Sequence, residues 1–263
     1  MNARRPTVAL PPVTVSEHDG VRYLHLGSIW VQGAMRIREP QRVELDYVQR
    51  MLAALLWLPS ARLDGRGEDA LAVQLGLGAG ALTRFTAQQL HLRTVAVEIN
   101  PEVVAANHAL FHLPPEAEIV VGDAIDWLAQ APAASVRLLL VDLYDQEAAA
   151  PVLDDEAFYA ACRRVLEEGG VMGVNLFGRH ASFERSIGRI AAAFGAAQVW
   201  SLKPTREGNT IVVAGRAVTV PAREELLARA AVLETRFGRL GLPARKWLRM
   251  VRPYAAARRP SDP

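Results

Sequence analysis

The sequence predicts an α/β fold in which a mostly parallel sheet is preceded by a small antiparallel β unit. Three observations support this prediction. Short apolar runs alternate with helix-like segments from residue 71 onward, a glycine-rich turn follows the first of these runs, and a hairpin signal stands near the start of the chain. Alternation of strands and helices is typical of βαβ units, and therefore of parallel strands.

The composition is that of a globular protein with a substantial core. The chain has 263 residues, 51% of them hydrophobic and 22% charged, which allows one large domain with an appendage. A net charge of +2 is too small to indicate a nucleic-acid partner, and the longest apolar segment, 51–58, is too short to cross a membrane. The single cysteine, Cys162, excludes a disulfide framework and a cysteine-based metal site. Without a secretory signal at the start, a cytoplasmic protein is expected.

We divide the chain into three parts. Residues 1–43 contain a loose arm and the small β unit, because residues 21–26 alternate in polarity after the turn signal Asp19-Gly20 and a further strand is expected over 28–37. Residues 44–220 form the main domain, which begins with a helix over 44–58 that Pro59 ends. Residues 221–263 form a C-terminal helix and a basic tail.

The main domain is organised around residues 71–100. An apolar strand, 71–75, leads into a turn in which Gly76, Gly78 and Gly80 alternate, and a helix over 83–90 follows. Glycine lets a backbone take positive φ and approach a ligand closely. The next strand ends on Glu98, where a carboxylate accepts hydrogen bonds from ribose hydroxyls. The alternatives are a dinucleotide site, since Gly76, Gly78 and Ala81 also fit that pattern, and a tight turn without a ligand.

Acidic residues also follow the later strands of this domain. Asp123 follows a strand over 119–121, and Asp142 and Asp145 follow a strongly apolar strand over 136–141. In open α/β sheets ligands bind at the carboxyl ends of the strands, so these acids are candidates for one site. Asp123 is also a candidate helix N-cap, and the two roles are compatible.

The last part of the main domain is expected to contain one more helix–strand pair, a helix and a hairpin. Asp154 is the predicted N-cap of a helix that extends to Glu167 and is closed by Gly169-Gly170. A fifth strand over 171–177, a helix over 183–194 and two antiparallel strands complete the domain. In this order the elements resemble the seven-stranded, Rossmann-like sheet of the S-adenosylmethionine-dependent methyltransferase fold.

A narrower resemblance covers about residues 13–216. The segments GLGAGA, VEIN, VGDAIDWL and VDLYDQ are similar, in order, to motifs of the spermidine synthase family of polyamine aminopropyltransferases. The resemblance implies a nucleoside site made by a glycine loop, a ribose acid and an adenine loop, with decarboxylated S-adenosylmethionine or S-adenosylmethionine as co-substrate and no metal. The residues implied for that nucleoside site are Gly76, Gly78, Gly80, Glu98, Asp123 and Ala124.

The same resemblance implies the residues that act on a small amine. Asp142 is the candidate base, since an amine must lose its proton before it attacks. Asp145, Tyr47, Tyr144 and Gln32 are the candidates for binding the amine; Tyr47 fits a core position equally well, and Asp145 fits a solvated loop. Neither nucleic acid nor a membrane is expected as a partner, and a homodimer is left open.

Three departures from the family keep alternatives open. Ala79 stands where the family usually has an aspartate in GGGDGG, Gln49 stands where it tends to have glutamate, and the loop after Asp142 keeps only its two acids. A carboxylate at position 79 would bind the donor's amino group. The chain is therefore an aminopropyltransferase, a methyltransferase that uses intact S-adenosylmethionine, or a non-catalytic nucleoside-binding relative.

Overall fold

The computed structural model describes residues 10–143, 153–177 and 180–254. An antiparallel sheet of β1 (Val13–His18), β2 (Val21–Leu26) and β3 (Val31–Arg36) comes first in the chain. Asp19 and Gly20 both have positive φ, 50° and 73°, as a two-residue hairpin turn with the twist of its strands requires. The predicted antiparallel β unit is therefore confirmed.

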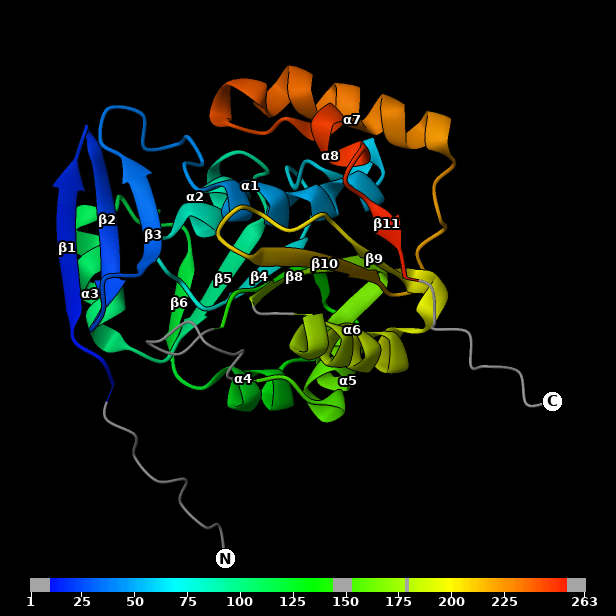
Figure 1. Cartoon of the computed structure of the whole chain (residues 1–263), viewed down its shortest axis with the longest axis horizontal. Coiled ribbons are helices and arrows are strands. Elements are labelled where there is room, and N and C mark those ends of the chain that lie inside the picture. Colours follow the sequence, from blue (N-terminus) through cyan, green and yellow to red (C-terminus); the bar gives the residue numbers. More distant parts are fainter. Residues whose placement is uncertain (1–9, 144–152, 178–179, 255–263) are drawn as a thin grey trace, which may run out of the picture.

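The main sheet follows the order β11-β9-β10-β8-β7-β4-β5-β6 (Figure 1). Neighbours from β6 to β8 pair in parallel, whereas β10 is antiparallel to both β8 and β9. The strands are β4 (Leu71–Leu75), β5 (Arg93–Glu98), β6 (Glu118–Val121), β7 (Val136–Val141), β8 (Leu166–Phe177), β9 (Val199–Ser201), β10 (Asn209–Gly215) and β11 (Arg252–Pro253).

This arrangement confirms the predicted α/β fold and its mostly parallel sheet, which has eight strands and not the seven that we predicted. One edge strand was not predicted. β11, with two residues, pairs with β9 and lies in the stretch that we assigned to the basic tail. So short a strand has no readable alternation, and only its partner defines it. The division into parts at residues 43 and 220 stays a prediction.

Helices cover both faces of the main sheet (Figure 1). α4, α5 and α6 pack on one face, while α1, α2, α7 and α8 lie over the other. Within the described residues, no helix combines the length and the apolar character that a membrane crossing needs. The helices are α1 (Asp46–Met51), η1 (Leu52–Trp57), η2 (Ser60–Arg62), α2 (Ala81–Gln88), α3 (Pro101–Leu110), α4 (Ala124–Gln130), α5 (Glu156–Val165), α6 (His180–Phe194), η3 (Ala196–Gln198), α7 (Arg223–Phe237), η4 (Gly238–Leu240) and α8 (Ala244–Leu248).

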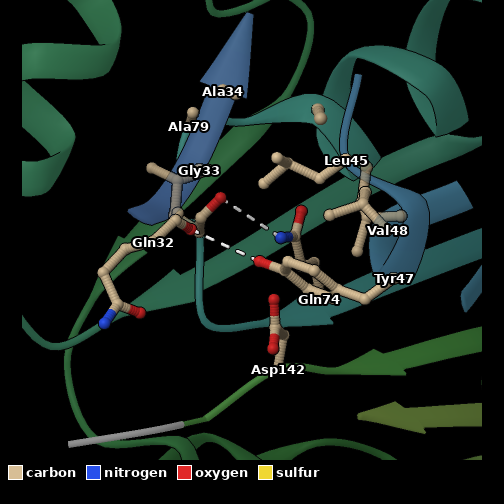
Figure 2. A pocket seen from close by; sticks show the side chains of 13 residues that line it. Gln32, Gly33, Ala34, Leu45, Tyr47, Val48, Gln74, Ala79 and Asp142 are labelled. Atoms are coloured by element: carbon tan, nitrogen blue, oxygen red, sulfur yellow. Dashed lines mark hydrogen bonds between the residues drawn. The ribbon is translucent and has the colours of Figure 1, made fainter. Parts of the chain in front are cut away.

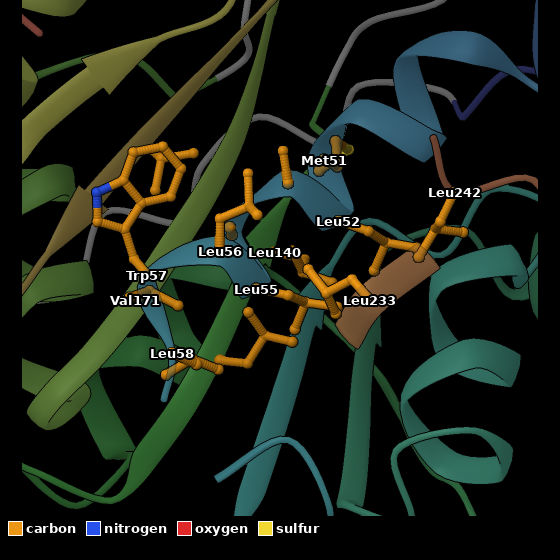
Figure 3. Packing of buried hydrophobic residues seen from close by; sticks show 14 of the residues in the cluster. Met51, Leu52, Leu55, Leu56, Trp57, Leu58, Leu140, Val171, Leu233 and Leu242 are labelled. Atoms are coloured by element: carbon orange, nitrogen blue, oxygen red, sulfur yellow. The ribbon is translucent and has the colours of Figure 1, made fainter. Parts of the chain in front are cut away.

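The predicted helix over 44–58 is in fact two short helices of different kind. α1 ends at Met51, and the chain continues as the 3₁₀ helix η1, in which all six residues are buried. Figure 3 shows the η1 side chains packed among residues of β7, β8, α7 and the segment that follows it. Trp57 also stacks at an angle on Trp200, with 4.9 Å between ring centroids. The segment LAALLW is apolar all round, so burial on every side, rather than helical amphipathicity, fixes its form.

The boundary between α5 and β8 also differs from the prediction. α5 ends at Val165 and β8 begins at the next residue, so Gly169 lies within a strand and does not close the helix. The N-cap is Asp155, whose Oδ1 accepts the Phe158 N–H at 2.7 Å. Asp154 instead accepts the Ser186 hydroxyl at 2.8 Å and pairs with Arg189, which joins the start of α5 to α6. Two neighbouring aspartates are equivalent caps by sequence, and the partners on α6 decide between them.

Candidate functional site

The glycine turn lies between β4 and α2, where the carboxyl ends of three strands meet. The Gly76 N–H donates to the Val97 carbonyl of β5, and the Asp142 N–H donates to the Leu75 carbonyl, each at 2.9 Å. Gly76 has a φ of 87°, and a Cβ added to it would stand 2.1 Å from the Asp142 carbonyl oxygen. Only glycine therefore allows β4 and β7 to end so close together.

Glu98 closes this turn from β5. Its two carboxylate oxygens accept the N–H groups of Leu77 and Asn100, each at 2.9 Å. Burial raises the pKa of Glu98, these backbone donors partly offset the rise, and the charge of Asp142 adds to it. The position at the end of β5, facing the glycine turn, is the one that the sequence predicted.

Asp123 and Ala124 lie on the neighbouring strand end. The Asp123 carboxylate accepts the Ile125 N–H at 2.8 Å, so the predicted N-cap of α4 is confirmed. Ala124 is buried as the first residue of that helix. The Gly122 N–H donates to the Glu98 carbonyl at 2.9 Å, which places this loop beside Glu98. A role of either residue in binding adenine stays a prediction.

A small pocket opens between the glycine turn, β3 and α1 (Figure 2). Its volume is about 20 Å³, roughly the room of one water molecule. Gln32, Tyr47, Gln74, Ala79 and Asp142 are among the residues that line it. The Tyr47 hydroxyl lies 3.5 Å from the backbone carbonyl of Gln32, and in Figure 2 the Gln32 amide points away from Tyr47 and Asp142. Gln32 thus turns its carbonyl toward Tyr47.

Asp142, at the carboxyl end of β7, is the carboxylate of this pocket. Its Oδ1 accepts the Asn175 Nδ2–H at 2.9 Å, and the Tyr47 hydroxyl also hydrogen-bonds its side chain. Burial raises the pKa of Asp142 and is the largest effect, whereas the bonds from Asn175 and Tyr47 lower it. A carboxylate with a raised pKa in a pocket has the character of a proton acceptor.

Two polar residues of the site were missed by sequence reasoning. Gln74, in the middle of β4, accepts the Thr83 hydroxyl at 2.5 Å and donates to the Leu77 carbonyl at 3.3 Å. Asn175, in β8, holds Asp142 as described above. Both are nearly fully buried, with 4% and 3% exposure. The signal available was a single amide in each of the apolar strands LAVQL and VMGVNLF, where an unpaired polar group is costly.

Ala79 lies under β3. It is 3% exposed, and a Cβ added to Gly33 would stand 2.4 Å from the Ala79 N atom. Arg84 donates to the Ala79 and Phe111 carbonyls at 2.7 and 2.5 Å, and burial lowers its pKa to about 10. Position 79 is therefore apolar and tightly covered. The Arg84 guanidinium, which contacts its backbone carbonyl, remains charged at neutral pH.

The structure thus brings together most of the predicted site. Gly76, Gly78, Glu98, Asp142 and Tyr47 surround the same strand ends, and Gly80 starts α2 with a φ of 67°. Gln32 joins them through its backbone. Tyr144 and Asp145 lie outside the described residues, so their placement stays a prediction.

The fold resembles that of known methyltransferases and spermidine synthases. The methyltransferase domain family matches residues 73–174. Among solved structures, a probable spermidine synthase from Corynebacterium glutamicum has a TM-score of 0.70 at 17% identity, over 98% of this chain and 100% of its own. Human methyltransferase-like protein 13 in complex with SAH has a TM-score of 0.63 at 20% identity, over 74% and 93%. Spermidine synthase from Thermotoga maritima has 0.56 at 16% identity, over 86% and 87%. These likenesses establish the methyltransferase fold.

Curated relatives define the family. A polyamine aminopropyltransferase of Chromobacterium violaceum is 34% identical over 240 residues, which cover 89% of this chain and 88% of the relative. One from Neisseria meningitidis is 32% identical over 211 residues, or 78% and 76% of the two chains. The chain belongs to the polyamine aminopropyltransferase family, as its motifs predicted, and is a transferase.

Proposed function

We propose that this protein transfers an aminopropyl group from decarboxylated S-adenosylmethionine to a putrescine-like polyamine. The observation that carries the proposal is the Asp142 carboxylate, which lies in a pocket beside the glycine turn in a chain of this family. Its raised pKa and its hydrogen bond with Tyr47 support a role as proton acceptor.

The nucleoside would bind along the glycine turn. Gly76 and Gly78 leave the backbone free of side chains, and Glu98 offers carboxylate oxygens for ribose hydroxyls next to the Asp123–Ala124 loop. The sulfonium of the donor supplies an activated leaving group. The residues of this chain fit such a ligand, since carboxylates and bare backbone meet at the carboxyl ends of β4, β5 and β6.

Asp142 would act on the acceptor. An alkylamine is protonated at neutral pH, with a pKa of about 10. Its proton passes to the Asp142 carboxylate, its nitrogen bonds to the aminopropyl carbon, and the carbon–sulfur bond breaks with the electron pair left on sulfur. Tyr47 would orient the carboxylate, and Asp145 and Tyr144 would hold the amine. Fixing the reactants in line contributes much of the acceleration.

Methyl transfer from intact S-adenosylmethionine is the second candidate. The observation that favours it is Ala79, which is buried under Gly33 where the family has a carboxylate. An aspartate there would repel the donor's carboxylate, whereas alanine does not. The donor is therefore the point on which the two functions differ.

Calorimetry separates the two candidates. We expect decarboxylated S-adenosylmethionine and methylthioadenosine to bind, and the carboxylated donor to bind about tenfold more weakly, a difference of about 1.4 kcal/mol, because the carboxyl groups of Asp142 and Glu98 oppose a further negative charge at the site. Tighter binding of the carboxylated donor would favour methyl transfer. If neither sulfonium binds, both candidates fail.

Mutation of Asp142 tests its role. We expect Asp142→Asn to lower amine turnover by about 10²–10⁴-fold, because the proton acceptor is lost, while methylthioadenosine binding stays nearly constant. Asp126→Asn, a change at an exposed acid in the first turn of α4, is the matched control and should retain turnover. Full activity of Asp142→Asn would remove Asp142 as the base.

A further inference from the structure

A chain of amides leads from Asp142 away from the pocket, across β8 and β10. Asn175 of β8 donates Nδ2–H to Asp142 Oδ1 at 2.9 Å. Asn209 of β10, which faces Asn175 from the next strand, donates its own Nδ2–H to Asn175 Oδ1 at 3.2 Å. The register of the sheet places these residues diagonally, two positions apart on the same face, because Asn209 pairs with Phe177 and Ile211 pairs with Asn175.

We propose that Asn175, oriented by Asn209, is a positioning residue that keeps Asp142 ionised and aimed into the pocket. The proposal rests on the proposed function, in which Asp142 accepts the proton of the amine. It adds residues that neither the motifs nor the glycine turn indicate.

The orientation of the Asn175 amide decides whether it can stabilise the Asp142 carboxylate. A carboxamide has a donor end and an acceptor end, and only the donor end stabilises a carboxylate. Because Asn209 donates to Asn175 Oδ1, the Nδ2 end is directed toward Asp142. Asn209 is held in turn by Thr205, whose Oγ1 accepts the Asn209 N–H at 3.2 Å and whose N–H donates to the Asn209 carbonyl at 2.8 Å. The Thr205 hydroxyl also lies 3.4 Å from Asn209 Oδ1, which leaves the Nδ2 end of Asn209 for Asn175. The Thr205–Asn209 turn therefore favours the orientation of Asn175 in which Nδ2 meets Asp142.

The surroundings of Asp142 show why a donor matters there. Tyr47 from α1 and Asn175 from β8 donate to its carboxylate, while Glu98 from β5 bears a like charge. Burial favours the neutral carboxylic acid, which cannot accept the proton of an amine. The two donors oppose this effect, and Tyr47 alone would have to do so without Asn175.

Packing alone does not account for an amide at this position. Asn175 is 3% exposed, and the residues on either side of it in β8, Val174 and Leu176, belong to the apolar core. The backbone pairing of β8 with β7 and β10 needs no side chain. An apolar residue would fill the space without the cost of burying an amide, so the hydrogen bonds to Asp142 and Asn209 are what the amide contributes.

The test is a direct titration of the Asp142 carboxyl by carbon NMR in full-length protein labelled at aspartate, with Asp142→Asn to assign the signal. We expect Asn175→Leu to raise the pKa of Asp142 by about one unit, because a charge-assisted hydrogen bond is lost. The acid limb of the pH profile of kcat/KM should move upward by the same amount, with little change in the affinity for methylthioadenosine. An unchanged pKa of Asp142 would overturn the proposal.

Two further variants keep the test decisive. Asn209→Leu leaves Asn175 in place but frees its amide, so it should shift the pKa of Asp142 in the same direction by less, and it serves if Asn175→Leu does not fold. Thr94→Val removes another buried polar side chain, near the amino end of β5 and therefore away from the strand ends that form the site, and it should not move this pKa. If Asp142→Asn kept full turnover, the proposed function would fail, whereas the titration would still decide whether Asn175 holds Asp142.

Discussion

Asp142 and Glu98 lie on either side of β4, and both carboxyls are harder to ionise in the folded chain than in the unfolded one. Burial is the largest cause for each. Hydrogen-bond donors oppose it, from Asn175 and Tyr47 at Asp142 and from backbone N–H groups at Glu98. These residues therefore cost stability in their charged form, which is common where a site is built for chemistry.

The sign of this effect gives a prediction for Asp142→Asn. The folded pKa of Asp142 lies above its unfolded value of 3.8, so stability is lost as pH rises through the folded pKa. We expect the variant to unfold at higher urea than the wild type at pH 7.5, and the difference to shrink at pH values below 4. Urea titrations at the two pH values measure it. A wild type that is the more stable protein at pH 7.5 would contradict the prediction.

At the scale of elements, the β4–α2 turn depends on one close approach. The chain reverses over Gly76. The nearest atom that a side chain on Gly76 would meet is the backbone oxygen of Asp142, which is held in place by its strand. The alternating glycines predicted this turn, but not its neighbour, because β7 comes more than fifty residues later in the chain.

Gly76→Ala is expected to lower the free energy of unfolding by about 3 kcal/mol or more and to abolish nucleoside binding. The added Cβ is strained at positive φ and collides with backbone. Gly188→Ala, in α6 with open space around the added Cβ, is the control and should raise stability by about 0.5–1 kcal/mol. Chemical denaturation and calorimetry with methylthioadenosine measure both. A Gly76→Ala protein of normal stability would show that the turn has room that the structure does not give it.

At the scale of the whole molecule, two apolar layers enclose the sheet. The layer under α7 is built around η1, whose side chains contact strands and the C-terminal helices together (Figure 3). A separate small cluster joins Leu24 and Met35 of the N-terminal sheet to Leu77 and Ala79 of the glycine turn. The N-terminal sheet therefore forms one wall of the site, and Gly33 is where the wall meets the turn.

Leu55→Ala tests the central place of η1. Leu55 is fully buried, so its truncation leaves a cavity and should cost about 2–5 kcal/mol. Leu227→Ala removes the same atoms from a position of α7 that is 47% exposed, and it should change stability by no more than about 0.5 kcal/mol. Thermal unfolding compares the two. Equal losses would mean that η1 is not the core segment that its burial indicates.

The sequence by itself determined the α/β order, the glycine turn, the acids at the strand ends and the family. These are local patterns, because strand periodicity, turn glycines and capping residues act within a few positions of each other. It did not determine the 3₁₀ form of η1, the end of α5, or which aspartate caps that helix. Those depend on partners that packing supplies from distant segments, such as Arg189 for Asp154.

The tertiary structure alone decided how the site is supported. Gln74, Asn175 and Asn209 are single amides in apolar strands, and no spacing in the sequence connects them with Asp142. The strand order β10-β8-β7-β4 brings them side by side, since neighbours in a sheet need not be neighbours in the chain. The packing of the N-terminal sheet against the glycine turn likewise places β3 over Ala79, so that part of the pocket is apolar. Local patterns are sufficient to predict the glycine turn and the acids around it, but burial and cross-strand hydrogen bonds shift the pKa values of those acids.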